Sequence, residues 1–323
     1  MFSQISKPAL TGPAATAFRI DDEPVRSDLT RAFRHLVCAE PASAPILQKA
    51  LVHLASHPGS LIRARMAWHV GQTCGLSEET SRNLAIGVEY FHTASLVFDD
   101  LACMDDASVR RNAVCVHKRF GEATAILAAL ALVNRAYALI WGETAGLAGG
   151  HGLKVSRFVE SCLGASGVLS GQSRDLNFNS QDESAEEILE IAAGKTVTLL
   201  KLALCLPGLV ADASSSTIDR LAGLALARGL GYQIADDFKD VFQEEKESGK
   251  TSNRDRSLER PNLVTKVGVP LAARRLNDLV HEGDEIEKAL LRDNPGWAFL
   301  NGLRIAVGPA LLNKDGVPLS GDL

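Results

Sequence analysis

Aspartate residues gather in two short segments of this chain, each set in an apolar stretch. Adjacent carboxylates on a buried helix repel one another and are costly to remove from water. Mg²⁺ offsets that cost, because it prefers oxygen ligands and fills its other positions with water and phosphate oxygens. The residues concerned are Asp99, Asp100, Asp105, Asp106, Arg110 and Arg111 in the first segment, and Asp236, Asp237 and Asp240 in the second. Two such clusters and an arginine pair predict a metal-bridged diphosphate site.

Helical spacing places several of these side chains on common faces. Asp236 and Asp240 are four residues apart, and Gln233 precedes Asp236 by three, so all three share one helical face. Asp99 and Asp105 are six apart near the expected end of a helix, where a bend would let their oxygens meet. Two facing carboxylate patches are expected to hold roughly two or three Mg²⁺ ions, which would neutralise a departing diphosphate.

Basic side chains must complete that neutralisation, since arginine binds phosphate through two hydrogen bonds and lysine acts as a point charge. The candidates are Arg110, Arg111, Lys195 and Lys250. Structural interpretations compete with this one: a single aspartate cluster is usually surface charge, His117 fits a packed or capping histidine, and Asp175 fits an interhelical ion pair. Two clusters in apolar contexts favour the diphosphate site.

Long helices must position these residues, and the placement of proline supports them. No proline occurs from Gly59 through Leu206, and proline breaks helix interiors. Ser77, followed by two acids, predicts a helix that runs towards Asp100.

The second half of the chain has its own helix signals. Ser184 and Glu187 have capping-box spacing and predict a helix that carries Lys195 and stops before Pro207. A further helix is expected from about Ile218 to Glu245. A polar loop over 246–261 and two more helical stretches follow.

Composition sets the architecture and the classes of protein that it excludes. With 323 residues, 46% of them hydrophobic, and no strand-like alternation, the chain is expected to be all-α, a single domain of about ten helices. Residues 1–26 are expected to be a flexible tail rather than a signal peptide, leaving 27–323 as the domain. The net charge of −5 implies no general affinity for nucleic acid.

Cysteine usage and hydropathy bear on the compartment. The six cysteines are scattered and form no CxxC pair, which is typical of reduced thiols in a cytoplasmic protein. No apolar run is long and uncharged enough to be expected to span a bilayer.

Seven segments occur in an order that resembles one known family. They are Glu89–Asp105, Arg110–Arg111, His117–Glu122, Gly171–Leu176, Lys195–Thr196, Gly231–Asp240 and Gly249–Lys250. Over roughly residues 30 to 265 the chain resembles the trans-type isoprenyl diphosphate synthases, the polyprenyl synthetase family. The resemblance implies helices packed around a central cavity (the isoprenoid synthase fold) and a homodimer. It also implies a Mg²⁺-dependent, head-to-tail condensation of isopentenyl diphosphate with an allylic prenyl diphosphate.

The resemblance also assigns roles to residues. It makes Asp99, Asp105 and Asp236 direct Mg²⁺ ligands, supported by Asp100, Asp237 and Asp240. The residues that it implies for the allylic diphosphate are Arg110, Lys195, Gln233 and Lys250. Thr196 and Gln233 would lie near the allylic carbon, where Thr196 and the pyrophosphate oxygens help to remove the proton.

One loop departs from the family's pattern. The family binds isopentenyl diphosphate with a Gly-Gly-Lys-Arg-x-Arg-Pro loop, and Arg63 matches its last arginine, but Ser60 and Leu61 replace the lysine and the first arginine. A lost charge-assisted bond removes about 1.5–3 kcal/mol. Gln72 falls where a His or Gln is expected to contact the same diphosphate.

Two compensations are open. Arg65 or Arg111 would replace the lost charge, or the alignment slips by two and places Arg63 and Arg65 on the two arginines.

The residues before Asp99 bear on product length. Ala94 and Ser95 stand five and four positions before Asp99, and enzymes of the family that stop at fifteen carbons carry a bulky aromatic five before. Alanine leaves no floor there, so the next obstruction is Phe91, about 4.5 Å deeper, or Leu130 and Leu132 on a facing helix. The resemblance then implies a C20 or longer product.

Two other functions remain open at this point. A terpene synthase-like enzyme would ionise a prenyl diphosphate without condensation, which the Ser60 loop motivates. A non-catalytic partner subunit would need a second chain, although two complete aspartate motifs argue against it.

Overall fold

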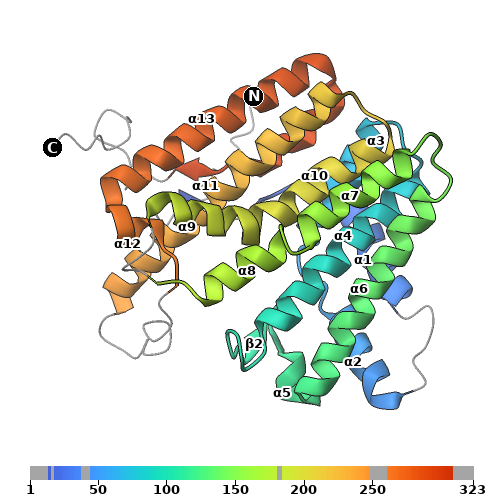
Figure 1. The fold of residues 1–323 in the computed structure, drawn as a ribbon, viewed down its shortest axis with the longest axis horizontal. Helices are drawn as coiled ribbons and strands as arrows, with labels where there is room; N and C mark the ends of the chain where they lie inside the picture. The colour runs from blue at the N-terminus through green and yellow to red at the C-terminus, as the bar shows by residue number, and fades with distance from the viewer. Residues whose placement is uncertain (1–13, 16–17, 38–43, 180–183, 248–259, 308–323) are drawn as a thin grey trace, which may run out of the picture.

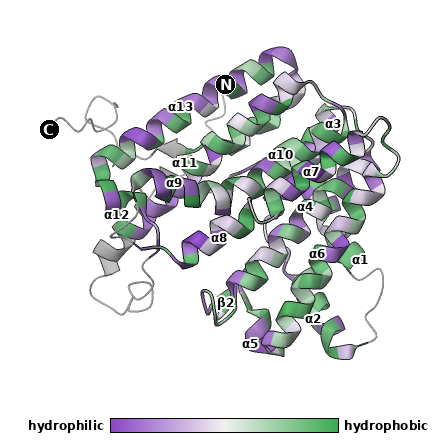
Figure 2. Ribbon diagram, viewed as in Figure 1, coloured by the Kyte–Doolittle hydropathy of each residue, from purple (hydrophilic) through white to green (hydrophobic). Residues whose placement is uncertain are grey.

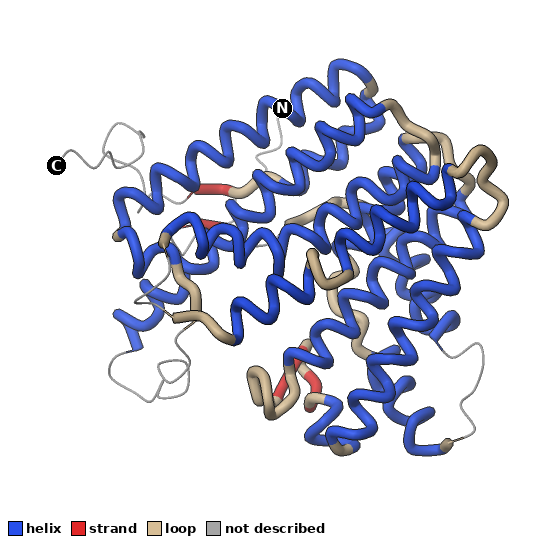
Figure 3. Tube along the Cα trace, in the orientation of Figure 1, coloured by secondary structure: helices blue, strands red, loops and turns tan. Residues whose placement is uncertain are grey.

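The computed structural model describes residues 14–15, 18–37, 44–179, 184–247 and 260–307, and confirms the expected all-α fold (Figures 1 and 3). The helices are α1 (Glu23–Val37), α2 (Pro45–Ser56), α3 (Ile62–Thr73), α4 (Glu78–Asp99), α5 (Val116–Phe120), α6 (Glu122–Thr144), α7 (His151–Leu163), α8 (Val168–Leu176), α9 (Ala185–Ala192), α10 (Thr198–Val210), α11 (Ser215–Glu247), α12 (Leu263–Val267) and α13 (Val269–Asp293). A π-helical turn, η1 (Ala193–Val197), joins α9 to α10, and a 3₁₀ segment, η3 (Pro295–Leu303), follows α13.

Helix α4 lies at the centre of the core and carries the first aspartate segment at its end. The Ser77 side chain caps it by accepting from the Thr80 amide, as the sequence predicted. Neighbouring helices α3, α6 and α10 pack around α4, while α11 and α13 lie side by side along one edge (Figure 1). The aspartate segment that begins at Asp99 therefore follows a helix that is packed against several others.

The segment from α9 to α10 follows the predicted start but not the predicted end. Ser184 and Glu187 form the expected capping box. The helix was expected to stop before Pro207, yet α10 continues to Val210 with Pro207 inside it. An internal proline costs about 3 kcal/mol, but nearly every side chain of α10 is buried, and this apolar burial holds the helix together.

Two strand pairs of two residues each were not anticipated. Strand β1 (Ala14–Ala15) pairs with β4 (Ala306–Val307), and β2 (Val109–Arg110) pairs with β3 (Ala113–Val114), both antiparallel. Arg111 and Asn112 between β2 and β3 both have positive φ, 51° and 59°. This is the turn geometry that tight hairpins favour. The hairpin presents Arg110 and Arg111 beside the end of α4.

The N-terminal segment packs against the domain earlier than predicted. Helix α1 begins at Glu23, inside the range expected to be a tail. Asp22 accepts from Arg65 Nε at 2.6 Å and lies 2.7 Å from His69 Nε2, and Ile20 is buried. The boundary at residue 26 is therefore too late, while most of residues 1–17 lie outside the described part.

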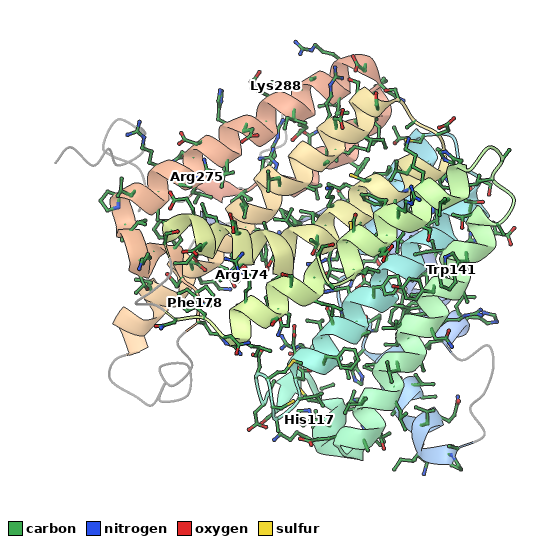
Figure 4. The ribbon with its side chains drawn as sticks, in the orientation of Figure 1. His117, Trp141, Arg174, Phe178, Arg275 and Lys288 are labelled. Atoms are coloured by element: carbon green, nitrogen blue, oxygen red, sulfur yellow. The ribbon has the colours of Figure 1, made fainter. Side chains whose placement is uncertain are left out.

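Helix α6 corrects the expectation that no helix would suit a membrane. Among the described residues, it alone is long and apolar enough to span one, with 39% of its apolar window buried in the fold. A core helix of a soluble protein meets the same criterion, so the match is weak evidence. Figure 2 shows the apolar residues along α6, and Figure 4 labels Trp141 on it. Leu127, Leu130 and Trp141 are each about half exposed.

Candidate diphosphate and metal site

The first aspartate segment folds back on the end of α4. Asp99 is the last residue of the helix, and the Asp105 amide donates to the Asp99 carbonyl at 2.9 Å. This closes the bend that the sequence required. Burial raises the pKa of the Asp99 carboxyl to about 6, Lys195 opposes the shift, and the neighbouring Asp105 carboxylate adds to it. A buried carboxylate with an acidic neighbour favours a nearby cation.

Asp100 supports this segment rather than facing the same space. Its side chain is buried and accepts from Arg110 Nε at 2.9 Å and Nη2 at 2.7 Å. That fork fixes the β2–β3 hairpin to the end of α4. Arg110 keeps 40% of its side chain exposed and remains in reach of the Asp99 charge.

The second segment lies on α11, and it too has one buried, hydrogen-bonded aspartate beside more open ones. Asp237 is buried, accepts from the Leu263 amide at 2.8 Å and from Gln233 Nε2 at 3.0 Å, and anchors α12. Burial raises the pKa of Asp237 to about 6. Asp236 is more open and lies 3.6 Å from Lys239 Nζ, and Asp240 is exposed.

The predicted catalytic residues come together between η1 and α11. Thr196 Oγ1 donates to Gln233 Oε1 at 3.2 Å, and Gln233 Nε2 donates to Asp237 Oδ1 at 3.0 Å. Lys195 Nζ donates to Asp175 Oδ2 at 2.7 Å.

Helix α8 can bring Asp175 this close because two glycines meet. A Cβ on Gly171 would overlap the backbone of Gly194, so only glycine lets α8 and η1 touch. This contact sets the Lys195–Asp175 pair at the edge of the aspartate segments.

Sequence reasoning missed Arg260. Its Nη2 donates to Asp105 Oδ1 at 2.5 Å and its Nη1 to Asp175 Oδ2 at 2.9 Å. Arg260 stands 20 residues after Asp240 at the end of a polar loop, and no helical periodicity links it to the motifs. The one available signal was its position directly before the predicted helix.

A second basic cluster lies further back along α4, about two turns before Asp99. Arg63 Nη1 donates to His92 Nε2 at 3.1 Å, and Glu89, which is buried, accepts from the Ala64 amide at 3.3 Å and from Arg111 Nη2 at 3.3 Å. Burial, with the Arg63 charge, holds the pKa of His92 well below its usual value.

Two buried hydrogen-bond donors of this cluster have no acceptor among the described residues. Because His92 Nε2 accepts, its proton belongs on Nδ1. Within the described part of the chain, His92 Nδ1 and Arg63 Nε are buried without hydrogen-bond partners. Buried donors are nearly always satisfied, so this pair suits an oxygen-rich anion.

The divergent loop packs onto the same cluster. Gly59 and Leu61 have positive φ of 75° and 53°. A Cβ at Gly59 would lie 2.6 Å from Arg111 Nε, so the loop rests on that guanidinium. Ser60 is exposed and Leu61 is buried. Thr93 Oγ1 and the His57 carbonyl each accept from Arg111 at 3.4 Å.

Three sequence assignments need correction or lie outside the description. Gln72 donates to Ser81 Oγ and to the Leu76 carbonyl. Gln72 stands nine residues after Arg63 on α3, or about 13 Å further along the helix. His92, by contrast, contacts Arg63 directly. Arg65 is bound to Asp22 and to the Ile20 carbonyl, so it cannot supply the lost charge. Lys250 lies outside the described residues.

The residues proposed to set product length lie along α4. Phe91 is buried, and its ring lies edge-to-face with that of Tyr137 on α6, with 4.8 Å between the ring centroids. Ala94 is buried. It stands seven residues after Gly87, which faces Ile140 of α6. Because seven residues return to the same side of a helix, Ala94 also faces α6. Ser95 is less buried and donates to the His92 carbonyl.

The facing-helix obstruction is also corrected. Leu130 is 51% exposed and cannot form a cavity floor, whereas Leu132 is fully buried.

The donor chemistry fits a hard cation, although the side chains are not gathered around one. Within the described residues, no three Asp, Glu, His or Cys side chains converge closely enough to hold a metal. Asp99, Asp105 and Asp236 offer carboxylate oxygens, which Mg²⁺ prefers. Arg260 already engages Asp105.

Comparisons with known proteins show the family of this chain. Residues 44–289 match the model of the polyprenyl synthetase family. The chain is 32% identical over 256 residues to a geranylgeranyl diphosphate synthase of Pantoea ananas, covering 79% of this chain and 82% of that protein. It is 34% identical over 209 residues to one from Pseudescherichia vulneris, covering 65% of this chain and 66% of that protein.

Solved structures share the fold. A geranyltransferase from Helicobacter pylori, complexed with magnesium and isoprenyl diphosphate, has a TM-score of 0.70 at 25% identity and covers 89% of this chain and 97% of that one. An FPP/GFPP synthase from Zymomonas mobilis has a TM-score of 0.72 at 23% identity, covering 87% and 95%. With the family model matching most of its length, this chain belongs to the polyprenyl synthetase family.

Proposed function

We propose that this protein is a Mg²⁺-dependent trans-prenyltransferase that condenses isopentenyl diphosphate with an allylic prenyl diphosphate. The observation that carries the proposal is the pair of clusters of charged side chains that lie along α4, one at its end and one about two turns before it. One contains Asp99, Arg110 and Lys195, and the other contains Arg63 and His92. Relatives named geranylgeranyl and farnesyl diphosphate synthases support condensation over ionisation alone.

The allylic half ionises its substrate. Bound Mg²⁺, roughly two or three ions held by Asp99, Asp105 and Asp236, would stabilise charge on the departing diphosphate. Arg110, Lys195 and, by the family's pattern, Lys250 bind the diphosphate oxygens. The C–O bond breaks, the electron pair leaves with the pyrophosphate, and an allylic cation remains. Fixed charge aimed at the leaving group is the main catalytic contribution.

Residues on η1 and α11 then guide carbon–carbon bond formation. The double bond of isopentenyl diphosphate attacks the cation, a new C–C bond forms, and the resulting cation loses a proton. Thr196 Oγ1 and Gln233 Oε1, 3.2 Å apart, are placed to orient that proton towards a pyrophosphate oxygen. Asp237 holds Gln233 in position through its own hydrogen bond.

The homoallylic half relies on Arg63, His92 and Arg111. The unpartnered donors of Arg63 and His92 supply two hydrogen bonds to a diphosphate. Arg111 supplies charge, although Glu89 partly neutralises it. Ser60 adds none, so we expect isopentenyl diphosphate to bind more weakly than in relatives with the complete loop.

Product length, assembly and location complete the proposal. Small side chains at Ala94 and Ser95, with Phe91 below them, favour a C20 product. The half-exposed apolar residues of α6, including Leu127 and Trp141, suit a homodimer interface. The five described cysteines are unpaired, which supports a cytoplasmic location.

Metal dependence tests the proposal. Asp99→Ala and Asp236→Ala are each expected to lower turnover by orders of magnitude, and EDTA to abolish it. Turnover that persists in EDTA would overturn the assignment.

A further inference from the structure

Arg260 links the two aspartate motifs through one short stretch of chain. Its guanidinium reaches Asp105 of the first motif and Asp175 of α8. Three residues later the Leu263 amide donates to Asp237 of the second motif. Residues 260–263 therefore contact both motifs.

Arg260 donates to an Asp105 oxygen that a metal ion would also bind. Its Nη2 lies 2.5 Å from Asp105 Oδ1, a charge-assisted contact about twice as strong as a neutral hydrogen bond. A divalent ion on that oxygen would stand against a guanidinium of the same sign. Arg260 and a metal ion would therefore compete for that oxygen.

We propose that Arg260 is an exchangeable counter-cation that holds Asp105 until a diphosphate arrives. The diphosphate, richer in charge than one carboxylate, draws the guanidinium away and frees Asp105 for the metal. Diphosphate and metal then favour each other's binding beyond their direct contact. This inference rests on the proposed function, because it presumes that the site receives both.

A simpler electrostatic account makes a different prediction. If Arg260 acted only as a positive charge near the site, neutralising Asp105 would strengthen diphosphate binding whether or not Arg260 were present. If Arg260 is exchanged, Asp105→Asn strengthens diphosphate binding because it releases Arg260. That increase in affinity should then be absent when Arg260 is removed. A double-mutant cycle separates the two.

The experiment measures binding of inorganic pyrophosphate by calorimetry in EDTA. The four chains are wild type, Asp105→Asn, Arg260→Gln and the double variant. Asp105→Asn is expected to tighten binding about tenfold in the wild-type background and less than about twofold in the Arg260→Gln background. Equal gains in both backgrounds would overturn the exchange.

A second readout uses Mn²⁺ alone, followed by its paramagnetic resonance. Arg260→Gln is expected to bind Mn²⁺ about tenfold more tightly than wild type. The control is Arg174→Gln, the same charge change on α8, where Arg174 pairs with Glu190 (Figure 4). Unchanged Mn²⁺ affinity in Arg260→Gln, or an equal gain in Arg174→Gln, would contradict the proposal.

Two safeguards keep the outcomes distinct. If Arg260→Gln does not fold, the cycle is run with Arg260→Lys, which keeps the charge but cannot fork across Asp105 and Asp175. There the gain from Asp105→Asn is expected to fall to about a third of its wild-type size, and an undiminished gain would overturn the exchange. A wild-type chain that binds neither pyrophosphate nor Mn²⁺ would contradict the proposed function instead.

Discussion

Arg63 donates to Nε2 of His92 across 3.1 Å, from α3 to α4. The contact fixes the imidazole with its proton on Nδ1, and among the described residues neither that donor nor Arg63 Nε has a hydrogen-bond partner. His92 thus lies beside Arg63, whereas Gln72, to which the sequence assigned the diphosphate contact, donates to Leu76 and Ser81 instead. The isopentenyl diphosphate pocket can therefore be tested one residue at a time.

Removing His92 tests its role in that pocket. His92→Leu is expected to raise KM for isopentenyl diphosphate about fivefold to tenfold, because one hydrogen bond of about 1 kcal/mol is lost. KM for the allylic substrate should change little. Gln72→Leu is the control, and steady-state kinetics with each substrate varied is the measurement. A KM that responds to Gln72 and ignores His92 would reverse the assignment.

Acid should destabilise the fold through the same histidine. Burial holds the pKa of folded His92 well below 6.5, whereas the unfolded chain binds a proton near 6.5. The unfolded state therefore binds more protons below that pH, and stability falls as pH drops from 7 towards 5. Replacing His92 with Asn should flatten this dependence of Tm. An identical pH dependence in both chains would show that other groups cause it.

A lysine at position 60 should strengthen the weak half of the site. Ser60→Lys is expected to lower KM for isopentenyl diphosphate about tenfold or more, because it restores one charge-assisted bond. KM for the allylic substrate should stay nearly constant. Ser56→Lys, on the exposed end of α2, controls for net charge. If both lysines act alike, position 60 does not face the pocket.

Bulk on α4 should shorten the product. Ala94→Tyr is expected to move the main product from C20 to C15 and to lower Tm, because position 94 packs against α6 and overpacking costs about 1–3 kcal/mol. Ser95→Tyr, on a more open position, should shorten the product with less loss of stability. Product chromatography and thermal unfolding give both readouts. An unchanged product in both variants would place the length determinant elsewhere.

Local chemistry explains why some of this structure could be predicted. The end of α4 at Asp99 and the capping box at Ser184 follow from residues that are close in sequence. The paired aspartate segments could likewise be found from the sequence, since each gathers its acids within a few residues of the chain.

Long-range pairing explains the rest. Arg65 turns to Asp22 and Arg260 turns to Asp105, partners 43 and 155 residues away. Nothing in the spacing of an arginine says which of several carboxylates it will choose. Pro207 inside α10 was missed for a related reason: tertiary burial outweighed the local cost.

The central claim is that this chain joins two prenyl diphosphates. The direct measurement supplies Mg²⁺, farnesyl diphosphate and isotopically labelled isopentenyl diphosphate to the full chain and identifies the products by mass. The account predicts labelled geranylgeranyl diphosphate that disappears in EDTA. Farnesol or a cyclic hydrocarbon without label, formed at the same rate when isopentenyl diphosphate is left out, would contradict it.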